Sequence, residues 1–151
     1  LEEDVATYNY NNLGWWNFQM SELDKLVKSN NPFEKRMAKR LRSFINALID
    51  DNIDFNKEQK IVDLSALEFL YMVKTITDPK NFDSYLKIIS SSSKVEDYGT
   101  ALFYLEELLK NGFKDKDALY DLEDSALLRV TPEFNDLIDK YFNDSSILKD
   151  K

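Results

Sequence analysis

Only three glycines and three prolines interrupt the 151 residues of this chain. A β-sheet protein of this length needs many tight turns, and those turns draw heavily on both residue types. Apolar residues instead recur at intervals of three and four, as in Trp16, Met20, Leu23 and Val27. That spacing places them on one face of a helix. The chain is therefore predicted to be all-α.

Start and stop signals divide the chain into six or seven helices. Asn31–Pro32, Asp78–Pro79 and Thr131–Pro132 each pair a capping residue with a proline suited to the first helical turn. Gly112 is the preferred type of residue for a left-handed helix end. The connections are short and predict a stack of antiparallel helical hairpins, with residues 50–60 as a loop or frayed helix start. The predicted helices cover residues 14–29, 32–50, 61–77, 79–91, 95–111, 116–121 and 131–142.

The chain is expected to hold one helical domain at residues 14–143. Residues 1–13 are acidic and then rich in Asn and Tyr, and we interpret them as a lead-in or linker. Residues 144–151 are expected to form a polar tail. Because residue 1 is Leu, the chain is expected to be a mature product or a segment of a longer protein.

The composition excludes several classes of function. The chain has neither Cys nor His, so zinc sites of the Cys/His type and nucleophiles activated by His are impossible. A net charge of −8 repels nucleic-acid phosphates, and no apolar run is long enough to cross a membrane. We therefore expect no enzyme, cofactor, metal, nucleic-acid partner or membrane span.

One segment has the alternation of a calcium loop. Asp50, Asn52, Asp54 and Asn56 follow one another at every second position. Such a loop also needs Gly at its sixth place and a bidentate Glu at its twelfth, where this chain has Phe55 and Ile61. An ordinary helix end with polar caps is the favoured interpretation.

A basic cluster lies in the second predicted helix. It would suit an acidic partner or a phosphate surface, but aromatic residues for base stacking are not interleaved with it. A solvated face that pairs with nearby acids is the favoured interpretation. The cluster comprises Lys35, Arg36, Lys39, Arg40 and Arg42.

Residues 79–113 resemble a tetratricopeptide repeat. The first helix carries Tyr85, Ile88 and Ile89, the turn reads Asp97-Tyr98-Gly99-Thr100-Ala101, and Leu105 and Leu108 follow. The resemblance implies that Ala101 lies where two helices cross closely. It departs from the family at Ile89, where a small residue is usual, and at 111–113, where Asn-Gly-Phe replaces the closing Pro.

That ending, followed by Thr131-Pro132-Glu133-Phe134, resembles the terminal unit of bacterial tetratricopeptide arrays that follow catalytic, hydrolase-fold domains. The resemblance implies an accessory domain of a larger bacterial protein. It favours a periplasmic or secreted location over a cytoplasmic one.

Two sets of residues are candidates for partner binding. Trp15 and Trp16 are adjacent, so one helix face cannot bury both, and exposed Trp is common at interfaces; packing against the lead-in is the alternative. Asp83, Lys87 and Ser90 are expected on the outward side of the 79–91 helix. The Ser90–Ser93 run is expected to cap or turn.

The expected function is a non-catalytic protein–protein interaction or scaffold module. The alternative is a C-terminal auxiliary domain that positions or regulates a hydrolase domain absent from this chain. The partner would be another protein or another domain of the parent chain. A groove lined by the 79–91 helix would favour the first function, and an exposed apolar patch on the N-terminal helices would favour the second.

Overall fold

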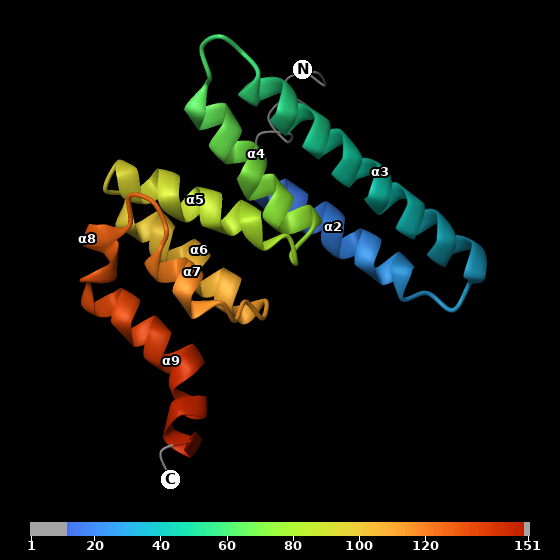
Figure 1. The fold of residues 1–151 in the computed structure, drawn as a ribbon. Helices are drawn as coiled ribbons and strands as arrows, with labels where there is room; N and C mark the ends of the chain where they lie inside the picture. Colours follow the sequence, from blue (N-terminus) through green and yellow to red (C-terminus); the bar gives the residue numbers. More distant parts are fainter. Residues whose placement is uncertain (1–11, 150–151) are drawn as a thin grey trace. The chain divides into compact units, whose positions relative to one another are not determined.

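The computed structural model describes residues 12–149, with side chains described as far as residue 142. These residues form eight helices and no strand, which confirms the all-α prediction (Figure 1). Most of the predicted lead-in, residues 1–11, lies outside the described residues, as do the side chains of the predicted polar tail. The chain divides into two compact units, residues 1–79 and 80–151.

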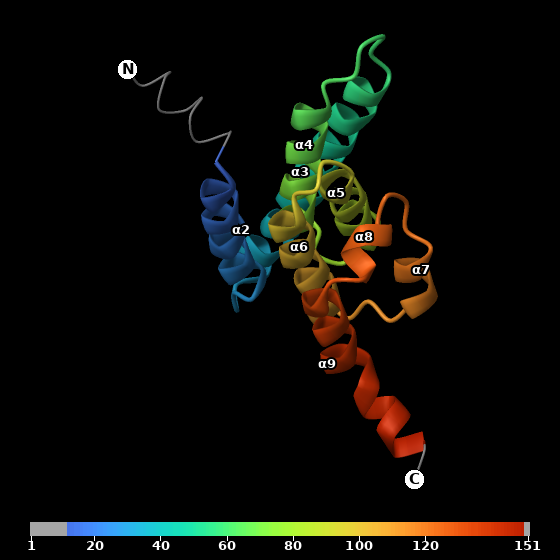
Figure 2. The ribbon, with the colours of Figure 1, turned by 90° about the vertical axis from the view of Figure 1, so that its left-hand side faces the viewer.

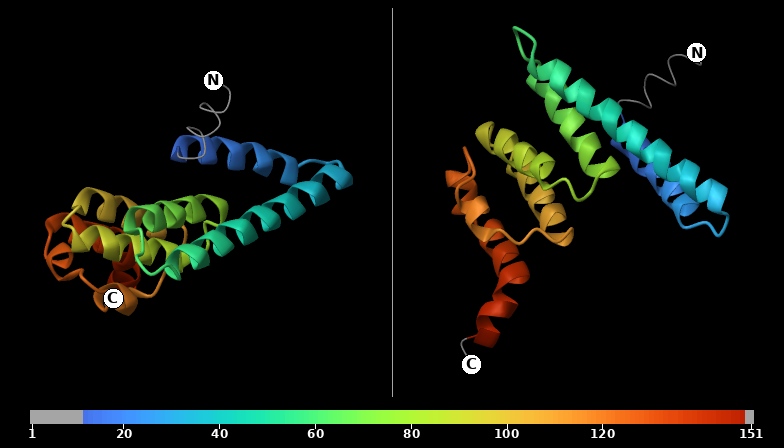
Figure 3. Two further views of the ribbon diagram at one scale, coloured as in Figure 1. Left: turned by 90° about the horizontal axis from the view of Figure 1, so that it is seen from above. Right: turned by 45° about the vertical axis from the view of Figure 1, so that its right-hand side comes forward.

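The first unit consists of α2 (Leu13–Val27), α3 (Pro32–Lys57) and α4 (Leu64–Thr77). A polar side chain caps the start of each helix, and Asn31 does so with Pro32 in the first turn, as predicted. The short turn at residues 28–31 sends α3 back past α2 (Figure 3), and α4 then packs beside α3 (Figure 2). Part of the core between these helices is formed by Met20, Leu23 and Ala38, packed with Val27, Ile45 and Ile76.

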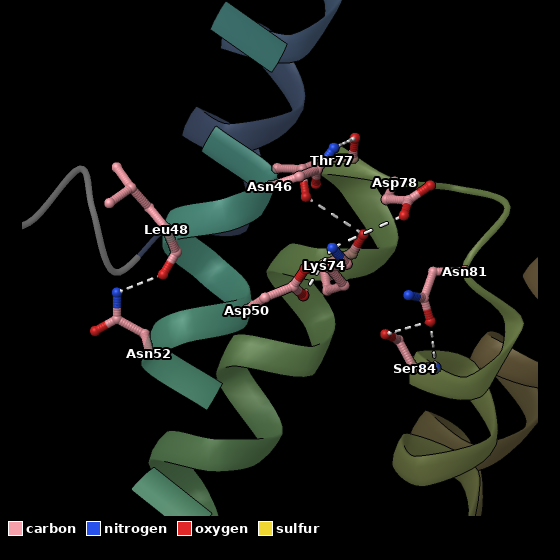
Figure 4. Close-up of polar contacts among 9 residues, drawn as sticks. All are labelled: Asn46, Leu48, Asp50, Asn52, Lys74, Thr77, Asp78, Asn81 and Ser84. Carbon is pink, nitrogen blue, oxygen red and sulfur yellow. Dashed lines mark hydrogen bonds and ion pairs between the residues drawn. The ribbon is translucent and has the colours of Figure 1, made fainter. Parts of the chain in front are cut away.

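Helix α3 is seven residues longer than predicted, and the loop expected at 50–60 lies instead at 58–63. No Gly or Pro occurs between Asp50 and Lys57, and the buried Ile53 continues the inward face of Ile49 by one turn. The Asn52 amide donates to the Leu48 carbonyl at 2.8 Å (Figure 4). The alternating Asp and Asn residues therefore lie along a helix, where side chains two apart point to different sides.

Polar contacts fix α4 against α3. The Lys74 ammonium, whose side chain is only 4% exposed, lies 2.8 Å from Asp50 Oδ1 and 3.8 Å from Asp78 Oδ2 (Figure 4). The carbonyl oxygen of Thr77 accepts from Asn46 at 3.2 Å and from the Arg42 guanidinium at 3.1 Å. Arg42 and Asn46 of α3 thus satisfy a carbonyl at the C-terminal end of α4, where a helix leaves its last carbonyls without partners of its own.

The second unit consists of α5 (Phe82–Lys94), α6 (Tyr98–Lys110), α7 (Lys116–Tyr120), α8 (Ala126–Arg129) and α9 (Pro132–Lys149). The connection at 95–97 turns the chain sharply, with Glu96 at φ 60, so that α5 and α6 form an antiparallel hairpin. Helix α6 ends before Gly112, which has φ 100 as the sequence predicts. Helix α8 is a single turn, too short to produce a periodic sequence signal, and was not predicted.

The start and end of α5 differ from prediction. It begins at Phe82 rather than Pro79, because the Asn81 side chain accepts hydrogen bonds from the Ser84 amide at 3.2 Å and the Ser84 hydroxyl at 3.1 Å (Figure 4). It continues through the run at residues 90–93, which was expected to end it. Two of these serines, Ser92 and Ser93, are buried within its last turn.

Candidate interaction surfaces

An apolar stripe of α3 faces outward. An apolar helix stripe ordinarily faces the core, and the sequence groups Phe33, Met37, Leu41, Phe44, Ile45 and Leu48 on one such stripe. In the structure Ile45 is half-buried, whereas the other five are between 46% and 64% exposed, as is Phe55 two turns further on. We call this set the outer stripe: Phe33, Met37, Leu41, Phe44, Leu48 and Phe55.

The outer stripe borders a groove between α2 and α3. Two cavities of about 450 and 510 Å³ share Leu23, Leu26 and Leu41 in their walls, so they form one continuous depression, which we call the α2–α3 groove. Its charged or amide-bearing residues are Gln19, Glu22, Glu34 and Arg40. Its other wall residues are Trp15, Trp16, Met20, Phe33, Met37, Ala38, Phe44, Ile45, Leu48 and Ile49.

Both predicted tryptophans line this groove. Trp15 and Trp16 are each half-buried, with ring centroids 5.0 Å apart and ring planes at 88° in an edge-to-face contact. The sequence argument placed Trp16 inside and left Trp15 partly exposed. In the structure both side chains are half-buried and line the groove.

An arginine anchors the groove's two walls. The Arg42 guanidinium forms an ion pair with Asp24 on α2 and donates to the Thr77 carbonyl on α4. The side chain is only 23% exposed. Arg42 of the basic cluster therefore has a structural role, because it connects α3 to both α2 and α4. The rest of the cluster is exposed.

The second candidate surface lies between α5 and α7. Asp83, Lys87 and Ser90 line one cavity of about 530 Å³, which we call the α5–α7 cavity. The structure thus brings together the three residues that the sequence placed on the outward side of this helix. The remaining lining residues are Leu86, Asp115, Asp117, Ala118, Asp121, Leu122 and Glu123.

The α5–α7 cavity is acidic. Five of its ten lining residues are Asp or Glu, and Lys87 is its one basic residue. The Ser90 hydroxyl donates to the backbone carbonyl of Glu123 at 3.0 Å, which connects α5 to the segment after α7. The acids at 115–123 carried no sequence signal that marked them as part of a site. Only the fold brings them opposite α5.

One ion pair in the second unit shifts pKa values. The Lys140 ammonium lies 3.3 Å from Glu106 Oε2 and lowers the pKa of that carboxyl, to which Tyr141 also donates at 3.3 Å. The same contact raises the pKa of Lys140. Neither residue lines the groove or the cavity, and the pair connects α9 to α6, which pack against each other.

Interpretation of these surfaces rests on their own chemistry. None of the helices within residues 12–149 is long and apolar enough to cross a membrane. No family model, curated protein or solved structure matches the chain.

Proposed function

We propose that this chain is a non-catalytic protein–protein interaction module that binds an apolar helical surface in its α2–α3 groove. The observation that carries the proposal is the outer stripe of α3. Contiguous apolar patches on a protein surface mark sites of association, and aromatic residues are enriched at such contacts. The groove offers both, with Trp15 and Trp16 at one end and Phe33 and Phe44 at the other.

The energy available at this surface is sufficient for binding. Full burial of a Phe, Leu or Met side chain is worth roughly 1.5–3 kcal/mol, so covering the remaining half of each side chain contributes about 1 kcal/mol. Six such side chains and two tryptophans therefore supply several kcal/mol. That amount must offset the entropy lost on association. Only a partner whose apolar ridge fits the groove would cover enough of these side chains to do so.

The second unit supports the same class of function. The apolar helix positions of the resemblance are buried in the α5–α6 hairpin, with Tyr85 and Ile89 at no more than 2% exposed and Ala101 at 0%, whereas the turn residues 97–100 are not buried. Repeats of this family bind partners without catalytic residues. We assign the hairpin to that type and the whole chain to an accessory part of a larger bacterial protein.

A second candidate function uses the α5–α7 cavity. Its acidic lining, around Asp83, Asp117 and Asp121, suits a Lys- or Arg-rich segment of a partner protein. Binding there would weaken with salt. Asp117→Asn would reduce it, whereas Asp139→Asn, on the exposed side of α9, would leave it unchanged.

Site-specific photocrosslinking in the native host tests the main proposal. A photoreactive amino acid at Phe44 should form a discrete adduct with a protein, and Leu41→Glu should abolish that adduct. Ile61 is the control, because it is 89% exposed and lies in the α3–α4 connection outside the groove. Equal, diffuse crosslinking from positions 44 and 61 would refute the proposal.

The proposal also excludes hydrolysis by this chain. The chain has no His or Cys, the residues that most often act as general base and nucleophile in acyl transfer near neutral pH. The purified chain should not turn over a generic ester. Activity that survives repurification and disappears on a point substitution in this chain would contradict the assignment.

A further inference from the structure

We propose that the partner in the α2–α3 groove is a second copy of this chain, whose α3 packs antiparallel on the outer stripe. This inference rests on the proposed function and names its partner. Two features of α3 support it: the spacing of the outer stripe and the distribution of charge along the helix.

The outer stripe has the spacing of a helix–helix seam. Met37, Leu41, Phe44 and Leu48 follow one another at four, three and four residues, and Phe55 continues the stripe one heptad after Leu48. A repeat averaging 3.5 residues keeps a seam facing a partner helix along its whole length. From Met37 to Phe55 the seam is about 27 Å long at 1.5 Å per residue.

Charge along α3 is divided between its two halves. The first half carries the exposed bases Lys35, Arg36, Lys39 and Arg40, and the second half the exposed acids Asp50, Asp51 and Asp54. Arg36, Arg40, Asp51 and Asp54 lie along the same edge of the outer stripe, at helical intervals. Within the described part of the chain, none of these four side chains forms an ion pair.

Antiparallel pairing makes this arrangement self-complementary. Residues on the same edge of two antiparallel helices face each other, so Arg40 of one copy meets Asp54 and Asp51 of its partner, twice by symmetry. In the same register Phe44 packs against Leu48 and Met37 against Phe55. A parallel pairing would instead align the two basic halves, where like charges repel.

The two-fold axis of this arrangement passes beside Ala47, an exposed residue on the charged edge of the seam. The chain contains no cysteine, so a disulfide between two copies can form only through a cysteine introduced by substitution. Two Ala47→Cys copies would bring their thiols together. Two Asp51→Cys copies would be offset by about 15 Å along the axis, well beyond the reach of a disulfide. In a parallel pair neither position 47 nor position 51 would form a disulfide, because equivalent residues of one edge then lie on opposite sides of the seam.

The experiment combines sedimentation equilibrium with oxidative crosslinking of the chain. We expect a species of twice the 17.7 kDa chain mass and rapid disulfide formation by Ala47→Cys. We expect none by Asp51→Cys or by Lys39→Cys, since Lys39 lies on α3 away from the outer stripe. Arg40→Glu should raise the dimer dissociation constant roughly tenfold, and adding Asp54→Arg should restore it. Far-ultraviolet circular dichroism of each variant verifies that its helices are intact.

Two results would overturn the inference. One is a chain that stays monomeric at high micromolar concentration with no Ala47→Cys dimer. The other is crosslinking through position 51 in place of position 47, which would require a different register of the two helices. If the chain is monomeric and the photocrosslink from Phe44 joins it to a different protein, the interaction function stands and self-association is excluded.

Discussion

Replacing Ala101 by Leu tests the centre of the α5–α6 hairpin. Ala101 is 0% exposed, as are Ile88 and Leu105 in the same hairpin, and protein interiors are close-packed, so little room is expected around the methyl group. Leu adds three carbons to a packed position and forces neighbours from their preferred rotamers, which costs about 1–3 kcal/mol. The opposite change, Ala101→Gly, should also destabilise, by about 1 kcal/mol, since it lowers helix propensity.

Urea unfolding followed by circular dichroism measures the loss, and hydrogen exchange in α5 and α6 locates it. Ala126→Leu is the matched control, because Ala126 is exposed on α8 in the same unit. If Ala101→Leu unfolds at the same urea concentration as the unmodified chain, the close helix crossing does not exist. Ile89→Ala in the Ala101→Leu background tests the tetratricopeptide-like geometry further. The loss of stability in the double variant should be smaller than the sum of the losses in the two single variants.

Three further predictions follow from local geometry. Lys74→Ala should destabilise the first unit by about 2 kcal/mol in urea unfolding, because it removes a buried aliphatic stem as well as the ion pair with Asp50. Lys74→Met keeps most of the stem and should cost less than half of that, so equal losses of stability in the two variants would contradict the packing role of the stem. Glu96→Gly should stabilise the chain by about 0.5–1 kcal/mol in thermal unfolding, since a φ of 60 is unfavourable for Glu. A lower melting temperature would show that contacts of the Glu96 side chain stabilise the fold by more than its backbone angle costs. The pKa of Glu106 is lowered in the folded state, so its contribution to folding stability is complete above the ordinary glutamic acid pKa and disappears as pH falls through the folded value. Glu106→Gln should therefore make the unfolding free energy depend less on pH in acid, and an unchanged pH profile would exclude the Glu106–Lys140 pair as a source of that dependence.

The helices could be predicted from the sequence because their signals are local. Asn31–Pro32 and Gly112 mark helix ends through hydrogen bonds and backbone angles that involve only neighbouring residues. Where prediction missed an end, a competing local signal had been overlooked. Asn81 caps α5 in place of the Asp78–Pro79 pair, and Ile53 continues the inward face of α3 past Asp50.

The location of the candidate surfaces depended on tertiary structure. Helical periodicity placed Phe33 to Leu48 on one stripe, but it does not say whether another helix covers that stripe. In the structure Ala38, Ile49 and Ile53 of α3 are buried instead, and the Arg42 contacts with Asp24 and Thr77 hold α2 and α4 around that inner side. Likewise, Asp83 and Asp117 are 34 positions apart in the chain and share a cavity only because α7 folds back beside α5. Such pairings depend on which of several side chains, distant in sequence, packs on a given apolar surface. A local sequence pattern contains no information about that choice.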